Sequence, residues 1–362
     1  MTDKHADFIV RNEMPFNGGS PPTHLRRSFI TPREHFFVRS HAPVPAVDVA
    51  SYRLSVGGKV RSPINLSLDE LRSRFTARRL VATLQCAGNR RDELLALGEI
   101  PGELVWGADA IGNAEWEGAS LRDVLDAAGA NVPTARHVEF IGLDRVEDKG
   151  DPFGFGASIP IEKAMDGSVL LAWSMNSAAL APSHGAPLRV VVPGYIGARS
   201  VKWLGRIVVR DAPSENYFQA RAYRRFGPEA SPASANWASA PELRELPLNS
   251  VITSPAPDSS LPAGETVVEG YAVAGDGVGV RRVEVSVDDG ATWIDAVLAR
   301  ENQPWSWRFW SARVRLNPGA HRIVCRAWDS QGKTQPRDLR EVWNFKGYMN
   351  NAWHGVDVKV GE

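Results

Sequence analysis

Cys86 is the residue whose type and surroundings most clearly indicate chemistry. It lies in residues 84–91 (LQCAGNRR) and is one of only two cysteines among 362 residues. Two arginines follow it closely, and positive charge near a thiol favours the thiolate, which attacks electrophiles and ligates metals. The Gly88-Asn89 step is typical of a turn, so the thiol is expected where a strand gives way to a loop. These features leave three interpretations open: a catalytic nucleophile, a metal ligand or a small buried hydrophobic residue.

The segment around Cys86 resembles the cysteine loop of the sulfite oxidase family of molybdenum enzymes. Further segments resemble that family in the same order along the chain. They are residues 36–45 (FFVRSHAPVP), 142–144 (GLD), 184–194 (HGAPLRVVVPG), 197–203 (GARSVKW), 342–347 (VWNFKG) and 351–354 (NAWH). A set of motifs this long and ordered is highly specific for the family.

The resemblance implies a molybdenum cofactor. In the family, molybdenum is bound by the two dithiolene sulfurs of a pyranopterin (molybdopterin) and by one cysteine, which corresponds to Cys86. A soft thiolate suits a metal that changes oxidation state. Arg189 and Lys202 suit the terminal phosphate, and Asp144 suits N–H groups of the pterin. The resemblance assigns cofactor binding to Phe37, Val38, Arg39, Ser40, His41, Asp144, His184, Arg189, Ser200, Val201 and Lys202.

The resemblance also implies a site for sulfite or a similar small oxyanion, for which arginine is the natural partner. Tyr223 would donate a hydrogen bond to the substrate or to the transferred oxygen. Arg90 is expected to form a structural ion pair instead of contacting the substrate. The catalytic residues assigned by position are Arg39, Arg91, Trp106, Tyr223 and Lys346.

Two departures from the family pattern concern the substrate. The family's sulfite oxidases usually carry arginine where this chain has Lys346, and lysine keeps the charge but loses the bidentate fork. A lysine that vertebrate members carry ahead of the pocket tryptophan is also absent, since residues 99–103 (EIPGE) stand there.

Three functions agree with these features. The first is molybdenum-dependent oxidation of sulfite to sulfate by oxygen-atom transfer, with electrons passed to a separate acceptor such as a cytochrome or dioxygen. The second is a related molybdenum reductase such as a eukaryotic-type nitrate reductase, or another sulfur-compound dehydrogenase. Those reductases usually lack the tyrosine that corresponds to Tyr223. The third is a dimeric binding protein with an inactive cofactor site, which the intact cofactor residues disfavour.

The charge of the chain is balanced, with 42 basic and 42 acidic residues. No basic tail or stripe indicates nucleic acid or an anionic membrane as a partner. The longest apolar runs are far shorter than the roughly 20 residues of a membrane-spanning helix. Arg26 and Arg27 resemble an export signal only superficially, because polar residues follow them. We therefore expect a cytoplasmic location, with a periplasmic one left open.

Other site motifs are not found in the sequence. None of the eight histidines has His-x-His or His-Glu-x-x-His spacing, so a zinc site is not predicted. A protease dyad of Cys86 and His184 is disfavoured because neither flank matches a protease signature.

The elements that must position these residues predict an α+β fold in two domains. In residues 1–245, helix-like and strand-like segments alternate. Ser67 and Glu70 have the spacing of a capping box, and residues 121–129 read as a short helix that ends at a glycine. The resemblance makes this part a sulfite oxidase-like molybdopterin-binding catalytic domain. Residues 228–262 are rich in proline and read as a linker or wrapping segment instead of packed core.

Residues 246–362 have the two-residue period of strands, which predicts a β-sandwich. Asp289-Gly290 is typical of a hairpin turn, and Cys325 is expected to face the core. This part holds seven of the twelve tryptophans, more than a sandwich core of this size needs, so some are expected at an interface. The resemblance makes this part an immunoglobulin-like dimerisation domain and the protein a homodimer.

Overall fold

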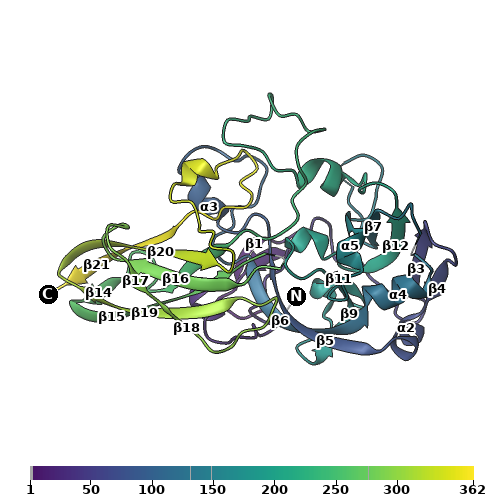
Figure 1. The fold of residues 1–362 in the computed structure, drawn as a ribbon, viewed down its shortest axis with the longest axis horizontal. Coiled ribbons are helices and arrows are strands. Elements are labelled where there is room, and N and C mark those ends of the chain that lie inside the picture. Colours follow the sequence, from purple (N-terminus) through teal and green to yellow (C-terminus); the bar gives the residue numbers. More distant parts are fainter. Residues whose placement is uncertain (1–2, 131, 148, 276) are drawn as a thin grey trace.

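The computed structural model describes residues 3–130, 132–147, 149–275 and 277–362. These residues form two parts that lie side by side along the longest axis of the molecule (Figure 1). The first part combines sheets with short helices, and the second is built mainly from strands, which confirms the predicted α+β class. Among the described residues, no helix is long and apolar enough to cross a membrane.

Two five-stranded sheets and a separate hairpin form the framework of the first part. One sheet has the order β10-β9-β6-β5 with β11 paired to β9, and the other has the order β4-β3-β12-β7-β8. The strands are β1 (Ile9–Asn12), β2 (Asn17–Gly19), β3 (Leu54–Gly58), β4 (Ile64–Leu66), β5 (Ala77–Gln85), β6 (Ile111–Ser120), β7 (His137–Gly142), β8 (Gly156–Pro160), β9 (Leu170–Met175), β10 (Ala178–Ala179), β11 (Arg189–Val191) and β12 (Leu204–Arg210).

Short helices join these strands. The predicted capping box is confirmed, because Ser67 Oγ accepts a hydrogen bond from Glu70 N and the Glu70 carboxylate accepts one from Ser67 N. The predicted helix at residues 121–129 is also confirmed, and Gly129 has the positive φ that a left-handed helix end requires. The helical segments are α1 (Pro22–Leu25), α2 (Leu68–Arg74), α3 (Arg91–Leu94), α4 (Leu121–Ala127), α5 (Ile161–Ala164), η1 (Pro182–His184), η2 (Gly197–Arg199), η3 (Phe218–Ala222) and η4 (Leu339–Glu341).

The second part is a sandwich of two sheets, with the orders β13-β15-β19-β18 and β14-β21-β20-β16-β17. Asp289 and Gly290 both have positive φ between β16 and β17, as a tight hairpin turn requires. Cys325 is fully buried in the core, as predicted. The strands are β13 (Asn249–Ser254), β14 (Ser260–Pro262), β15 (Gly264–Val273), β16 (Val280–Ser286), β17 (Ile294–Asp295), β18 (Val297–Leu298), β19 (Arg308–Leu316), β20 (Gly319–Asp329) and β21 (His354–Gly361).

The interpretation of residues 228–262 as a linker or wrapping segment is wrong for their second half. β13 is buried from Asn249 to Thr253 and pairs with β15, and β14 pairs with β21. The prolines mark the ends of β13, since they stand at 247 and 255, and the residues between them include β-branched ones that suit a strand. Composition averaged over the whole segment hid this short strand.

Several tryptophans of the sandwich pack against the first part. Thr83 of β5 donates its backbone N–H to Trp305 O at 2.9 Å, and Trp307 N donates to Thr83 Oγ1 at 2.8 Å. The indole N–H of Trp307 reaches Phe29 O at 3.1 Å. At least two of these tryptophans therefore form a contact within one chain. The high tryptophan content is for this reason weaker evidence for a contact between two chains.

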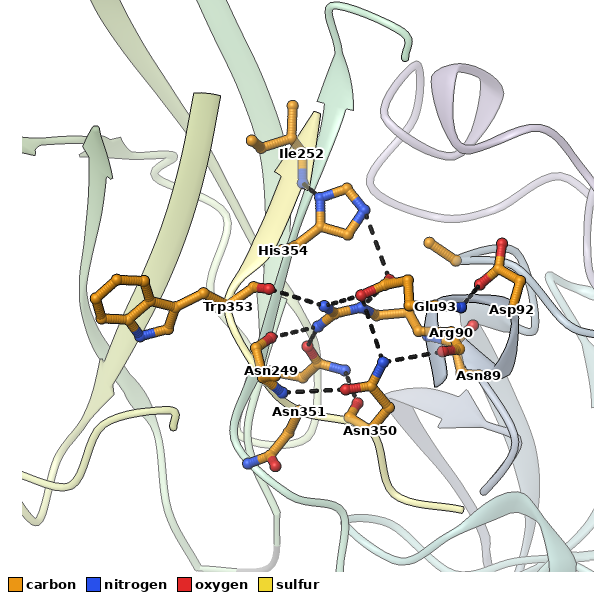
Figure 2. Close-up of polar contacts among 12 residues, drawn as sticks. Asn89, Arg90, Asp92, Glu93, Asn249, Ile252, Asn350, Asn351, Trp353 and His354 are labelled. Carbon is orange, nitrogen blue, oxygen red and sulfur yellow. Dashed lines mark hydrogen bonds and ion pairs between the residues drawn. The ribbon is translucent and has the colours of Figure 1, made fainter. Parts of the chain in front are cut away.

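A buried ion pair joins the loop after Cys86 to the sandwich (Figure 2). Arg90 Nε lies 2.6 Å from Glu93 Oε1, and its Nη2 lies 2.7 Å from Glu93 Oε2. The guanidinium also donates to Asn249 Oδ1 and to the carbonyl oxygens of Ala352 and Trp353. The structural role expected for Arg90 is confirmed.

Candidate functional site

One cavity brings together most of the predicted site residues. It encloses about 700 Å³, its open mouth included. Cys86 and Tyr223 line it together with every residue to which the resemblance assigned cofactor binding. Its lining includes Phe37, Val38, Arg39, Ser40, His41, Cys86, Asp144, His184, Arg189, Ser200, Val201, Lys202 and Tyr223.

Cys86 follows the last residue of β5 directly, where the strand gives way to a tight turn, as expected. Its own N–H donates to Ala110 O at 2.9 Å, and Gly88 N donates to the sulfur at 3.4 Å. A side chain at Gly88 would collide with the guanidinium of Arg91 at 2.6 Å, so glycine is required for this close approach. The turn holds the sulfur at the wall of the cavity with a backbone donor beside it.

A buried positive pole forms another wall of the cavity. Arg189 donates to His184 O at 3.0 Å and to Ser200 O at 3.1 Å, and Lys202 donates to Ser40 Oγ at 2.8 Å. In the described part of the chain, neither cation has an ion-pair partner within 4 Å. Burial lowers the pKa of Arg189 to about 9, and burial followed by the charge of Arg189 lowers the pKa of Lys202 well below its ordinary value. Arg189 is buried and Lys202 is half-buried, so an anion in the cavity would offset their charges, and a phosphate fits.

Lys4 extends this positive pole and was not predicted. Its Nζ lies 3.1 Å from His184 Nε2 and donates to Arg33 O at 2.7 Å and Phe36 O at 3.1 Å. Burial and, after it, the charge of Lys4 lower the pKa of His184 well below its ordinary value, so the ring is neutral. No sequence signal identifies Lys4, because it lies far ahead of the first motif and only the path of the chain brings it to the site.

Asp144, His41 and Tyr223 supply the polar groups of the rest of the wall. Asp144 Oδ1 accepts from Phe155 N at 3.0 Å, and burial raises its pKa. His41 Nε2 lies 3.0 Å from Tyr223 Oη. Burial, followed by Arg39 and Lys202, lowers the pKa of His41 well below its ordinary value, whereas burial raises the pKa of Tyr223. The pair therefore consists of a neutral imidazole and a protonated phenol, so the phenol can donate a hydrogen bond.

Arg91, Trp106 and Lys346 do not line the cavity in this structure. Arg91 donates to the carbonyl oxygens of Lys346, Gly347 and Leu104. Trp106 is fully buried, and its indole nitrogen has no hydrogen-bond partner among the described residues.

Glu103 holds the two cations of this group together. Its carboxylate lies 3.4 Å from Arg91 Nη2 and pairs with Lys346 Nζ. The same carboxylate lies 3.4 Å from Tyr348 Oη, and the ring of Tyr348 stacks on that of Tyr223 with centroids 5.3 Å apart. The cluster around Glu103 thus contacts the cavity wall through two stacked tyrosines. Sequence reasoning missed this role of Glu103, because nothing in its spacing marks a partner 243 residues away.

The fold and the cavity define an oxidoreductase that binds a molybdopterin cofactor. Residues 41–218 match the family model "Oxidoreductase molybdopterin binding domain", and residues 240–361 match "Mo-co oxidoreductase dimerisation domain". The lining of the cavity suits this cofactor, since a cysteine sulfur that could bind the metal lies at one wall and cations that could hold a phosphate lie at another.

The chain belongs to the sulfite oxidase family. It is 42% identical to mitochondrial sulfite oxidase of Rattus norvegicus over 99% of this chain and 66% of the relative. It is 36% identical to sulfite oxidase of Arabidopsis thaliana over 99% of this chain and 95% of the relative. The sulfane dehydrogenase SoxCD of Paracoccus pantotrophus has a similar structure, with a TM-score of 0.82 and 27% identity over 98% of this chain and 87% of that one. The chain spans about two thirds of the length of the rat relative.

The position of Cys86 leads to a first prediction. Cys86→Ser is expected to lower turnover by more than about 100-fold, because a hard hydroxyl replaces the soft thiolate at the metal. The protein should keep its fold and its pterin, because the pterin and phosphate contacts lie elsewhere in the cavity. Turnover, molybdenum content and pterin content of the purified variant check this.

Cys325→Ser is the matched control, since Cys325 is the second buried cysteine and lies in the sandwich core beside Ser250. Its turnover per folded molecule should equal that of the unchanged protein. A Cys86→Ser protein with near-normal turnover would show that Cys86 is not the ligand.

Proposed function

We propose that this chain oxidises sulfite to sulfate by oxygen-atom transfer and passes the electrons to a separate acceptor, a cytochrome or dioxygen. The observation that carries the proposal is the placement of Arg39 and Tyr223 in the same cavity as Cys86. One supplies a cation and the other a hydrogen-bond donor, which are the groups that a small oxyanion needs. The names of the relatives support the same substrate. We place the catalytic domain in residues 1–245, the dimerisation domain in 246–362 and the protein in the cytoplasm.

The cofactor supplies the oxygen-atom transfer when it is bound, and the protein positions the substrate. Asn17 Oδ1 and Ser40 O accept hydrogen bonds from Arg39 Nη1 at 3.3 and 2.5 Å, which orients the guanidinium at the cavity wall. Tyr223 keeps its proton, since burial raises its pKa, and can donate to an oxyanion. His41 is neutral and within hydrogen-bond distance of that phenol, so its ring can accept a hydrogen bond from the phenol and orient it.

Two alternatives follow from specific observations. The structural similarity to a sulfane dehydrogenase favours another sulfur compound as the substrate. The replacement of an arginine by Lys346 leaves a reductase such as a nitrate reductase open. Tyr223 argues for sulfite, because its phenol lies at the cavity wall with Arg39.

A steady-state comparison tests the proposed function. The molybdenum-loaded protein should oxidise sulfite with an artificial electron acceptor at a kcat/KM about 1000-fold or more above that for nitrate reduction with an artificial donor. Thiosulfate assayed with the same acceptor tests the sulfane alternative. A higher kcat/KM for nitrate or thiosulfate than for sulfite would show that sulfite is not the preferred substrate.

The carboxylate of Glu103 leads to a further prediction, because it forms ion pairs with both Arg91 and Lys346. A dianion that used these cations would have to compete with Glu103 for them. Glu103→Gln should therefore lower the KM for sulfite by about 3- to 10-fold, or roughly 1 kcal/mol, in steady-state assays. Lys346→Met should raise KM more in the Glu103→Gln background than in the unchanged protein, where the lysine is already paired.

Glu99→Gln is the control for this series, because Glu99 is an exposed glutamate on the same segment. It should leave KM unchanged. If Glu103→Gln behaves like Glu99→Gln, the cluster does not contact the substrate and Arg39 is its main cation.

We also propose that the protein is a homodimer through residues 246–362, as the match to a dimerisation domain supports. Light scattering at micromolar concentration should give twice the chain mass of 39.6 kDa. The mass should not fall on tenfold dilution, since a dedicated dimerisation domain is expected to form a stable interface. A single-chain mass at micromolar concentration would contradict the proposal.

A further inference from the structure

Three histidines that are far apart in sequence meet outside the cofactor cavity. His5 precedes β1, His24 lies in α1, and His35 directly precedes Phe36. Their ring centroids are 4.6 Å apart for His5 and His35, 5.0 Å for His24 and His35, and 5.4 Å for His5 and His24. One nitrogen from each ring lies within 4.8 Å of the nitrogens of the other two. This spacing allows all three nitrogens to bind one ion.

A carboxylate stands at the edge of this cluster. Asp7 Oδ2 lies 3.6 Å from His5 Nδ1 and 3.5 Å from His24 Nε2. Asp7 thus lies beside two of the three imidazoles, and its exposed side chain must rotate toward the centre of the cluster to act as a fourth ligand. Three histidines and one carboxylate are a ligand set that tetrahedral zinc accepts.

The hydrogen bonds of the rings leave nitrogen atoms available for an ion. His35 Nδ1 lies 2.9 Å from Ser20 Oγ, which orients the ring and leaves Nε2 for a metal. His24 is buried, and its Nδ1 has no hydrogen-bond partner among the residues that the structure describes. A buried ring nitrogen without a partner is costly and requires an explanation. A metal ion bound at Nδ1 itself would give this nitrogen the partner that it lacks.

The charge state of the cluster suits a cation. Burial is the first cause that lowers the pKa of both His24 and His35, followed by Arg27 for His24 and by His5 for His35. Both rings are therefore neutral at pH 7, and a neutral imidazole is the form that binds a metal.

We propose that His5, His24 and His35, with Asp7, bind one divalent transition metal ion, for which zinc is the expected ion. The site is closed by protein ligands, so its role is structural. It would attach the N-terminal segment to the residues before Phe36, and thereby hold Lys4 in its contact with His184. The ion is separate from the molybdenum cofactor, and the proposal does not depend on the substrate of the enzyme.

The absence of a sequence motif is consistent with this proposal. The prediction that no zinc site exists considered only histidines at short spacing. Here the intervals are 19 and 11 residues, and the ligands come from a coil, a four-residue helix and a turn. Such a site depends on the fold of the N-terminal segment, which spacing alone does not reveal.

Zinc binding to the molybdenum-loaded protein tests the proposal. After treatment with a chelator and gel filtration, titration with zinc should show one tight site per chain in addition to molybdenum, and zinc should raise the unfolding temperature. His5→Gln and Asp7→Asn should each weaken zinc binding by at least about 10-fold. Both positions are exposed, so these variants are expected to fold. Cobalt in place of zinc should give the absorption bands of a tetrahedral site.

His321→Gln is the matched control, because it removes a histidine of the sandwich that contacts Asn317 O. It should bind zinc like the unchanged protein. The Cys86→Ser protein should also bind zinc unchanged, which separates this site from the molybdenum ligand. Zinc binding that is absent, or that His5→Gln and Asp7→Asn leave unchanged, would overturn the proposal.

Discussion

The buried ion pair between Arg90 and Glu93 is the interaction on which the position of Cys86 depends. Arg90 has a left-handed backbone with φ of +65°, which a residue with a side chain rarely adopts. Both nitrogens that face Glu93 form bonds, and the guanidinium is fully buried. Burial opposes the charge on Glu93, yet Arg90 overcomes this and lowers its pKa. Loss of Glu93 would leave the buried charge of Arg90 without its carboxylate and cost about 3–5 kcal/mol.

The same ion pair makes the two parts of the chain interdependent. Arg90 contacts Asn249 at the start of the sandwich, and Asn350 donates to Arg90 O at 2.9 Å (Figure 2). Glu93 lies 3.9 Å from His354 Nε2 at the start of β21. The turn that carries Cys86 is therefore held from both sides, by its own strand and by the sandwich. The sandwich is a structural support for the site as well as the predicted dimer contact.

The cations of the cavity differ from Arg90 in their hydrogen-bond partners. Arg90 has a carboxylate partner, whereas Arg189 and Lys202 donate to carbonyl and hydroxyl oxygens only. Burial lowers the pKa of Arg189, and burial followed by the charge of Arg189 lowers the pKa of Lys202. A phosphate bound beside them would offset these charges, so a cofactor held there would stabilise the fold by mass action. For Arg91 and Lys346, the protein itself supplies the negative charge, through the carboxylate of Glu103.

The predicted site residues that the structure brings into one cavity share a physical property. Cys86, Arg189 and Lys202 lie within or beside short motifs whose strands and turns specify their local geometry. A motif recognised in the sequence therefore also predicts where these side chains lie. Lys4, Glu103 and the three histidines belong to no such motif. The residues that they contact are far away in sequence and are brought near by the fold of the whole chain. The spacing of these residues along the sequence follows no helix or strand period.

The missed strand β13 has a related cause, and so does the incomplete prediction for the tryptophans. β13 was missed because prolines at both ends of a short strand dominated the composition of the whole segment. The tryptophans were expected at an interface, and the structure shows that Trp305 and Trp307 contact the other part of the same chain. Composition indicates that large apolar surface must be covered. Composition does not show whether the covering surface comes from the same chain or from a second one. Burial of apolar surface gives the same gain in free energy per unit of area in both cases.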